Sequence, residues 1–264
     1  MINALHHISV GTANLVEAAQ LTERLLGALG IISHNKAIFR LNNVSYVIAT
    51  NVSDIAGLTG LGFEIASADD ALRICERRAL KVARPIEHTF DGVRTIDIDP
   101  QSTFGASIQL LERTEQSTRT PRDTAINSAA VAGLDHVVIR TSNPERATAL
   151  YGARLGLDLR LDRSEPKWGT RFMFFRCGDT IIEIVHNLNE QPSNEPDQLW
   201  GLTWRVVRAD AAHERLKNEG FDLSEIRPGR KPGTRVFTVR NKTLGVPTLI
   251  LESIVAAKGP QKPV

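Results

Sequence analysis

An internal repeat restricts the fold of this chain more than any other feature of its sequence. The segment 60–65, Gly-Leu-Gly-Phe-Glu-Ile, resembles the segment 201–206, Gly-Leu-Thr-Trp-Arg-Val, which lies 141 positions later. A second pair of segments, 5–10 and 134–139, also match, and each is followed by an apparent helix and a Leu-Gly pair. The chain is therefore predicted to contain two modules that occur twice. The longer spacing also relates these identical residues: Asp69 and Asp210, Ala71 and Ala212, Gly92 and Gly233, Arg94 and Arg235.

Each module is predicted to have the same order of elements. Segment 134–141 is a short β-branched run typical of a strand. Asn143 and Pro144 then begin a helix with a capping residue and a proline in its first turn, and Gly156 ends it. Three apolar strands follow, so the predicted order is βαβββ. The remaining predicted elements are strands at 157–161, 171–176 and 180–185, and in the fourth module a strand at 202–207, a helix at 209–219 and strands ending at 248–251.

The repeat also predicts the division of the chain. We expect an N-terminal domain at residues 1–113, a polar linker at 114–132, a C-terminal domain at 133–253 and a tail at 254–264. Halves of about 130 residues bury roughly two-thirds of their unfolded surface, which is enough for an independent core in each.

The composition excludes several classes of function. With 42% hydrophobic and 23% charged residues, the chain is globular, and its net charge of +2 gives no general attraction to nucleic acid or membranes. The first residues lack the basic start and apolar stretch typical of a signal peptide, and no apolar run approaches the roughly 20 residues that span a bilayer. Cys75 and Cys177 have no metal-site spacing and are expected to be buried thiols. A cytoplasmic protein is expected. The sequence also lacks a P-loop, a dinucleotide glycine motif and a Gly-x-Ser-x-Gly elbow.

These features resemble the vicinal-oxygen-chelate superfamily of glyoxalases, bleomycin-resistance proteins and extradiol dioxygenases. The strongest local matches are the segments 134–138 (Leu-Asp-His-Val-Val), 155–157 (Leu-Gly-Leu) and 180–184 (Thr-Ile-Ile-Glu-Ile), and the resemblance extends from about residue 4 to residue 253. It implies an α+β fold. In such a fold, four βαβββ modules pair into two cup-shaped mixed β-sheets with outer helices.

The resemblance also implies a ligand pattern of His, Glu, His, Glu for a divalent metal ion on the first and last strands of the modules. In the second half, His136 and Glu183 match the first two positions, whereas Gly201 and Leu249 occupy the others. In the first half, only His7 survives. The ligand set for a divalent metal ion is therefore incomplete, the first cup is expected to be degenerate, and the second is the expected active or binding site. The first-half residues at the other three positions are Val47, Gly60 and Gln109.

A third ligand could come from His186 or His213, which lie in the same half. His186 lies three residues beyond Glu183 and is expected to point to the other face. Glu112 and Glu252 lie three residues beyond the expected ligand positions, so they should be surface residues on the opposite strand face. His213 is expected to face solvent from a helix.

His136 and Glu183 have alternative interpretations. They are metal ligands, or His136 acts directly as an acid or base, or it is a hydrogen-bonded core histidine. Glu183 interrupts the apolar run Ile-Ile-Glu-Ile-Val and needs a partner, because an unpaired buried charge costs several kcal/mol. Thr203 and Arg205 alternate onto the same strand face. Arg205 could bind a substrate carboxylate or phenolate, or it could form an ion pair with Glu183.

The remaining candidates lie near the expected rim. Trp168 and Trp200 could hold an aromatic ring between them, although ordinary packing also explains them. Arg171 stands beside Trp168, and Arg235 ends the basic, turn-rich segment 226–235, which could steer an anionic substrate or be an exposed loop. These residues, with Thr203 and Arg205, are the predicted substrate-binding set.

The sequence leans towards an enzyme that acts on a small oxygenated organic substrate, a glyoxalase-like lyase or isomerase with a reduced or absent metal site. Two alternatives remain open: an extradiol-type ring-cleaving dioxygenase, and a non-catalytic small-molecule binding protein of the bleomycin-resistance type. The expected partner is a small molecule. Nucleic acid and membranes are not expected partners, and a homodimer remains an open alternative.

Overall fold

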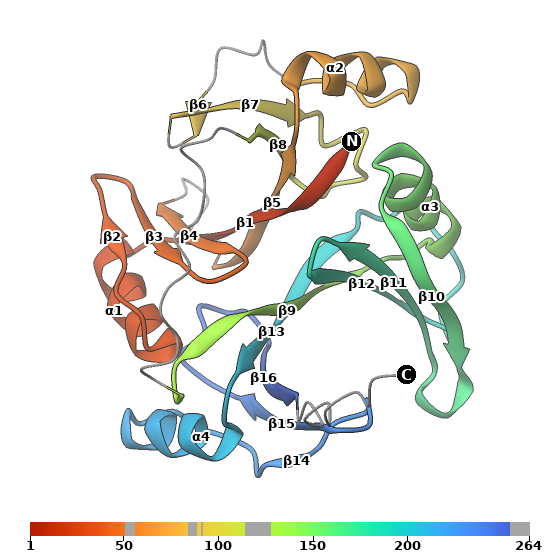
Figure 1. The fold of residues 1–264 in the computed structure, drawn as a ribbon. Helices are drawn as coiled ribbons and strands as arrows, with labels where there is room; N and C mark the ends of the chain where they lie inside the picture. Colours follow the sequence, from red (N-terminus) through yellow and green to blue (C-terminus); the bar gives the residue numbers. More distant parts are fainter. Residues whose placement is uncertain (51–55, 84–88, 91, 114–127, 254–264) are drawn as a thin grey trace, which may run out of the picture.

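The computed structural model describes residues 1–50, 56–83, 89–90, 92–113 and 128–253 (Figure 1). Most of the expected linker and the whole expected tail lie outside the described residues, and strand β9 begins at Val131, inside the expected linker. Within the described part of the chain, no helix has the length and apolar character needed to cross a membrane.

Two eight-stranded sheets of matching topology form the molecule. Their strand orders are β2-β3-β4-β1-β5-β8-β7-β6 and β10-β11-β12-β9-β13-β16-β15-β14. In each sheet the first strands of two modules run antiparallel at the centre, and each first strand is parallel to the last strand of its own module. The predicted α+β fold of paired βαβββ modules is confirmed.

The elements of the first half are β1 (Ile2–Thr12), α1 (Leu15–Leu26), β2 (Ile31–Ile32), β3 (Lys36–Arg40), β4 (Ser45–Thr50), β5 (Gly57–Ile65), α2 (Ala68–Arg77), β6 (Thr89–Phe90), β7 (Val93–Ile98) and β8 (Ile108–Glu112). Those of the second half are β9 (Val131–Arg140), α3 (Pro144–Thr148), the π-helix η3 (Ala149–Arg154), β10 (Asp158–Glu165), the short 3₁₀ turn η4 (Pro166–Trp168), β11 (Thr170–Cys177), β12 (Thr180–Asn187), β13 (Gln198–Val206), α4 (Ala209–Asn218), β14 (Arg227–Pro228), β15 (Thr234–Val239) and β16 (Thr248–Ser253). The sequence repeat appears directly in these bounds, because β5, α2 and β7 recur 141 positions later as β13, α4 and β15.

Local sequence explains where the helices begin and end. Asn143 caps α3 by accepting from the backbone N–H of Arg146, and Gly156 follows the helical segment with a φ of 80°. Helix α4 has no side-chain cap from its own first turn; instead, Glu252 accepts from the backbone N–H of Ala209 at 2.7 Å.

Glu112 does the same for α2, at 3.1 Å from the backbone nitrogen of Ala68. The expectation that Glu112 and Glu252 are simple surface residues is therefore wrong. Both point away from the expected ligand face, as predicted, but their carboxylates satisfy the first N–H groups of helices and stabilise their positive ends.

The helix-bearing sides of the two sheets face each other. Figure 1 shows α1 beside α4 and α2 beside α3, so each helix of one half lies next to a helix of the other. One continuous apolar core contains residues of both halves, including Tyr46 and Trp204, whose rings meet edge-on at 5.5 Å. We expected an independent core in each half; the shared core differs because strands of the two sheets contact each other directly, β5 with β13 and β1 with β11. Cys75 and Cys177 are free and buried, as predicted.

Two arginines reinforce this packing. Arg215 of α4 donates to the carbonyl oxygens of Arg24 and Leu25 at the end of α1, the latter at 2.9 Å. Arg154 of η3 donates to the carbonyls of Arg78 and Ala79 just after α2, the former at 3.0 Å. A cation at the negative end of a helix is favourable. In each contact the second half supplies the arginine and the first half supplies the helix end.

Candidate functional site

A β-bulge in β9 places two polar side chains beside each other. Leu134 pairs with Trp204 and His136 pairs with Thr203, so Asp135 is an extra residue between two adjacent partners. Simple alternation would send Asp135 and His136 to opposite faces. The bulge instead lets the Asp135 carboxylate reach His136, with Oδ2 2.9 Å from Nδ1.

The strand register defines one face of the second sheet, which we call the inner face. Val138 and Phe172 on this face are buried but lie outside the shared core, whereas the alternating residues Ile182 and Ile184 belong to that core. Successive rows on one face are about 7 Å apart. The first row contains His136, Ile181, Thr203 and Leu249; the second contains Val138, Glu183, Gly201 and Phe174; the third contains Arg140, Val185, Phe172 and Gln198.

His136 and Glu183 meet on this inner face. The Nε2 atom of His136 lies 3.2 Å from Oε2 of Glu183 and 2.8 Å from the hydroxyl oxygen of Thr203. Both side chains are largely buried, with 18% of His136 and 14% of Glu183 exposed, which leaves a small polar surface within apolar strands.

Asp135 fixes the orientation of His136. It also accepts from Nε of Arg205 at 2.9 Å, and Arg205 reaches Asp179 through Nη1 at 3.2 Å. Burial alone would raise the pKa of Asp135, but the hydrogen bonds from His136 and Arg205 outweigh it and lower that pKa to about 2. Asp135 is therefore ionised at neutral pH and acts only as an acceptor, so Nδ1 of His136 carries the proton and Nε2 faces the inner face.

Glu183 has the opposite electrostatic environment. Burial raises the pKa of its carboxyl above the ordinary value, and the nearby Asp135 charge adds to this effect. The positive charges of His136 and Arg230 oppose it without cancelling it. The structure therefore brings a low-pKa and a high-pKa carboxylate to the two sides of one imidazole.

These residues do not form a fitting set of ligands for a divalent metal ion. Within the described ranges no three His, Cys, Asp or Glu side chains gather as a metal site, and Gly201 and Leu249 supply no donor atoms. Both ring nitrogens of His136 already have protein partners. His186 is buried on the other face, where its Nδ1 lies 3.1 Å from the carbonyl oxygen of Thr141, in agreement with its predicted direction.

The other predicted residues separate into two groups. Thr203 contacts His136, and Arg205 binds Asp135 in place of Glu183. Arg235 binds Asp210 at the start of α4, on the helix-bearing side. His213 differs from the expectation of a solvent-facing residue: its Nε2 lies 3.0 Å from the carbonyl oxygen of Ser224 and its ring packs on Phe237.

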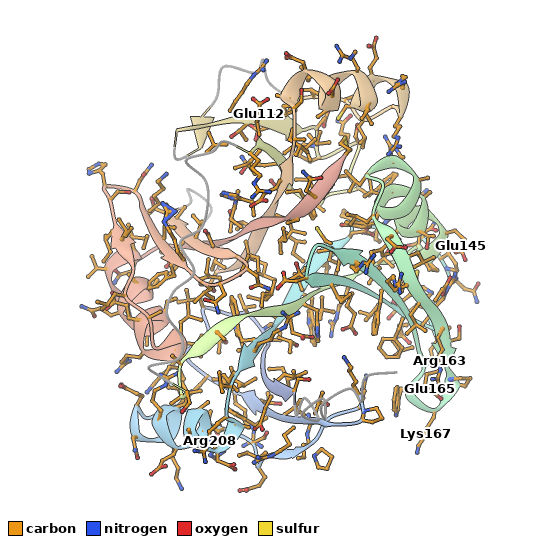
Figure 2. All side chains as sticks on the ribbon, viewed as in Figure 1. Glu112, Glu145, Arg163, Glu165, Lys167 and Arg208 are labelled. Carbon is orange, nitrogen blue, oxygen red and sulfur yellow. The ribbon has the colours of Figure 1, made fainter. Side chains whose placement is uncertain are left out.

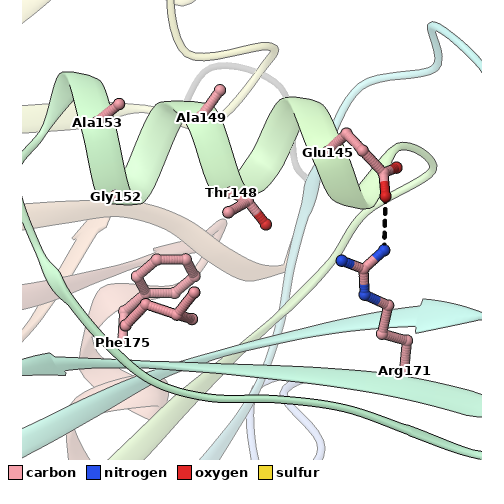
Figure 3. A pocket seen from close by; sticks show the side chains of 8 residues that line it. Glu145, Thr148, Ala149, Gly152, Ala153, Arg171 and Phe175 are labelled. Atoms are coloured by element: carbon pink, nitrogen blue, oxygen red, sulfur yellow. Dashed lines mark hydrogen bonds and ion pairs between the residues drawn. The ribbon is translucent and has the colours of Figure 1, made fainter.

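Arg171 also lies on the helix-bearing side, at one end of a separate pocket (Figure 3). The pocket has a volume of about 390 Å³ and lies between the α3–η3 helix and the outer strands of the sheet. Arg171 is held by Glu145 at 2.6 Å and by both oxygens of Asp162 at 2.8 Å. Arg171 and Arg235 therefore each form ion pairs with acidic residues on the helix-bearing side, away from the inner face. The apolar part of the pocket is formed by Thr148, Ala149, Gly152, Ala153, Leu159 and Phe175.

The two predicted rim tryptophans each carry an arginine on one ring face. The guanidinium carbon of Arg230 lies 4.1 Å from the ring centre of Trp168, and that of Arg140 lies 4.2 Å from Trp200. Neither Arg140 nor Arg230 was among the individually predicted site residues, and Asp135 was also missed. A repeated signal was available for Asp135, because polar pairs, His6-His7 and Asp135-His136, occupy the same place in both repeats.

Among the described residues of the first half, the positions equivalent to Glu183 and Thr203 carry no polar side chain. Val47 stands two residues past the partner of His7, as Glu183 stands two residues past the partner of His136. Gly62 replaces Thr203, and the His7 ring lies so close over Gly62 that a Cβ atom there would collide with it. His7 is only 1% exposed and therefore packs as a core histidine.

Replacing His7 by alanine should leave the function of the inner face within a few-fold of the wild-type value. The loss of a buried ring is expected to lower the free energy of unfolding by about 2–4 kcal/mol. Proton exchange or ligand affinity, together with thermal unfolding, would measure the two effects. A large functional loss in a folded His7→Ala protein would place the active site in the other half.

Known proteins share this sequence pattern and fold. The family model described as "Glyoxalase/Bleomycin resistance protein/Dioxygenase superfamily" matches residues 135–238. A curated relative from Cereibacter sphaeroides, named ethylmalonyl-CoA/methylmalonyl-CoA epimerase, is 29% identical over 97 residues, which cover 34% of this chain and 72% of that protein.

Solved structures resemble the whole chain. The Mn(II)-bound glyoxalase from Novosphingobium aromaticivorans has a TM-score of 0.76 at 15% identity, with 96% of this chain and 83% of that chain covered. BphC, a halotolerant catechol dioxygenase, has a TM-score of 0.70 at 14% identity, with 96% and 87% covered. At these identities the similarity concerns the fold.

Proposed function

We propose that this chain, in which residues 135–238 match the model of the glyoxalase, bleomycin resistance protein and dioxygenase superfamily, is an acid–base enzyme. Its reaction moves a proton at a carbon atom of a small oxygenated substrate, as a lyase or an isomerase does. The observation that carries the proposal is the contact of His136 Nε2 with Glu183 Oε2 at 3.2 Å, while Asp135 holds the other ring nitrogen.

The two proton-transfer groups suit this role for different reasons. Burial raises the pKa of Glu183 above the ordinary value of a carboxyl group, and a carboxylate with a raised pKa is a stronger base. Asp135 stabilises a positive charge on His136 and keeps its Nε2 atom directed at the inner face. Thr203, at 2.8 Å from Nε2, restricts the ring further.

A balanced reaction follows from this arrangement. The Glu183 carboxylate removes a proton from a carbon next to a carbonyl, and the electron pair of the broken C–H bond moves to the carbonyl oxygen. The imidazolium form of His136, with protons on both ring nitrogens and its positive charge stabilised by Asp135, donates the Nε2 proton to that oxygen, which gives an enol. Return of a proton to carbon gives an isomer, whereas loss of a group from the neighbouring carbon gives a lyase product. The name of the Cereibacter sphaeroides relative, an epimerase, supports the isomerase form.

Deuterium exchange tests the proposal before the natural substrate has been identified. The protein would be incubated in D₂O with small 2-oxo and 3-oxo acids, and exchange at carbon followed by proton NMR. His136→Gln should reduce exchange by about 10²-fold or more. His213→Gln is the matched control, since His213 is bonded to Ser224 away from the inner face. Equal exchange by wild-type and His136→Gln proteins, or none above the uncatalysed rate, would reject the acid–base role.

A non-catalytic binding protein is the second candidate. Phe172 and Phe174 lie in the third and second rows of the inner face, with ring centres 6.3 Å apart, and Trp168 contacts Phe172. Such a surface suits a small aromatic compound. This candidate predicts saturable binding without exchange. Ring cleavage is not proposed, because Gly201 and Leu249 stand where the family places further metal ligands.

A further inference from the structure

Two arginines on the inner face have no carboxylate at ion-pair distance among the described residues, although the charge of Arg230 acts on Glu183 from farther away. Within the described part of the chain, the guanidinium groups of Arg140 and Arg230 form no hydrogen bond or ion pair. The three arginines expected to bind substrate all have such partners: Arg205 binds Asp135 and Asp179, Arg171 binds Asp162 and Glu145, and Arg235 binds Asp210. The available positive charge of the site therefore belongs to Arg140 and Arg230.

Aromatic rings hold both guanidinium groups. Arg230 lies 4.1 Å from the ring centre of Trp168 and 5.5 Å from that of Phe172, and Arg140 lies 4.2 Å from that of Trp200. Stacking fixes the plane of a guanidinium group while leaving the N–H groups on its edge available for hydrogen bonds. A preorganised arginine of this kind matches the two oxygens of a carboxylate or phosphate.

Both arginines lie at the same end of the inner face. Arg140 pairs with Val185 across the ladder, Val185 pairs with Phe172, and Arg230 lies over Phe172. Arg230 lies in the turn between β14 and β15, at one edge of the sheet. Its side chain reaches Trp168, which lies in the β10–β11 hairpin at the other edge. Figure 2 labels Lys167 at this hairpin, beside Arg163 and Glu165, which pair with each other.

The distance from this end to the acid–base pair suits a small molecule. Glu183 stands one row before Val185 on β12, which corresponds to about 7 Å. Val138 and Phe174 stand beside Glu183 in the second row and offer an apolar surface between the two polar ends. A bound molecule that spans one row would place its far end at Glu183.

We propose that Arg140 and Arg230 bind the anionic group, a carboxylate or phosphate, of a small organic acid whose reacting carbon lies at His136 and Glu183. The reacting end of this assignment rests on the proposed function, whereas anion binding itself does not. Arg140 and Arg230 are specificity-determining residues that select acids over neutral molecules of the same shape.

Tryptophan fluorescence provides the test. The chain has three tryptophans, and the two that stack on these arginines are exposed, Trp168 by 46% and Trp200 by 36%, while Trp204 is 1% exposed. The probes are benzoate, phenylacetate and phenyl phosphate, each compared with benzamide or phenylacetamide as the neutral counterpart. At least one acid should change the emission saturably and bind about tenfold or more tightly than the amides, because it gains charge-assisted hydrogen bonds.

The variants assign the effect to the two arginines. Arg140→Gln and Arg230→Gln should each weaken binding of the acid about tenfold and leave the amides unchanged. Arg208→Gln is the matched control, because Arg208 is an exposed arginine just before α4 (Figure 2). Acids that bind no better than amides, or an equal loss in the Arg208→Gln protein, would overturn the assignment. Carboxylate and phosphate probes compared with each other identify the preferred oxyanion.

The same measurements in a Glu183→Gln background separate the two proposals. Arginine-dependent binding of acids without any hydrogen exchange would reject the acid–base function and keep the anion site. Exchange that depends on Glu183 but shows no preference for acids would reject the anion site and keep the function.

Discussion

Glu183→Gln is expected to reduce proton exchange by about 10²–10⁴-fold, because the amide keeps the shape of the side chain but cannot accept a proton from carbon. The loss should appear in the rate at saturating substrate, since Arg140 and Arg230 would still hold the anionic group. Glu145→Gln is the matched control: Glu145 is an acid of the same half, bonded to Arg171 on the helix-bearing side. Unchanged exchange in Glu183→Gln would remove the residue from the mechanism.

The same substitution is expected to stabilise the protein at neutral pH. Burial raises the folded-state pKa of Glu183 above its unfolded value, so the folded protein binds the proton more tightly. The stabilisation by the protonated form is full below the unfolded pKa and is lost as pH rises through the raised folded pKa. Glutamine remains neutral, so the variant does not lose this stabilisation. Its free energy of unfolding should exceed that of the wild type by about 1.4 kcal/mol for each unit of the pKa shift. Thermal unfolding of both proteins across this pH window would measure the difference, which should vanish in acid.

Asp135→Asn is expected to reduce proton exchange by about 10²-fold or more. An asparagine can present its NH₂ group to Nδ1 of His136, which would move the ring proton to Nε2 and remove the stabilisation of a positive ring. Nitrogen-15 NMR of the imidazole would show which ring nitrogen carries the proton, and deuterium exchange would give the rate.

Asp179→Asn is the matched control for Asp135. Asp179 binds the same arginine, Arg205, from its other end but does not contact His136, and 61% of its side chain is exposed. It should retain most of the activity. An equal loss in both variants would indicate that the charge on Arg205 matters more than the orientation of the ring.

The sequence was sufficient to predict the architecture because the repeat and the strand–helix pattern agree. The segments that matched at 60–65 and 201–206 became the equivalent central strands β5 and β13. The meeting of His136 and Glu183 followed from the family ligand positions. The placement of Asp135 did not, because the alternation rule assigns it to the opposite face and only the bulge in β9 reverses that assignment.

Other features of the site depended on contacts between distant segments. Arg230 reaches Trp168 because the sheet curves until its two edges meet, which no local pattern indicates. Arg205 faces the expected side, but its choice of Asp135 over Glu183 again depends on the bulge. Arg171 was assigned to the rim because of its position next to Trp168, yet the strand turns it to the helix-bearing side.

The paired helices and the shared core give the two faces of the first half different tolerance to mutation. Mutations on the helix-bearing side of the first half would disturb the core and the carbonyl contacts of Arg154 and Arg215, and so the whole protein. If the acid–base site lies in the second half, as we propose, mutations on the corresponding face of the first half leave it intact. We therefore expect relatives of this chain to drift fastest around Val47, Gly60 and Gln109. The first half would persist as a scaffold whose former active face is free to acquire a new ligand.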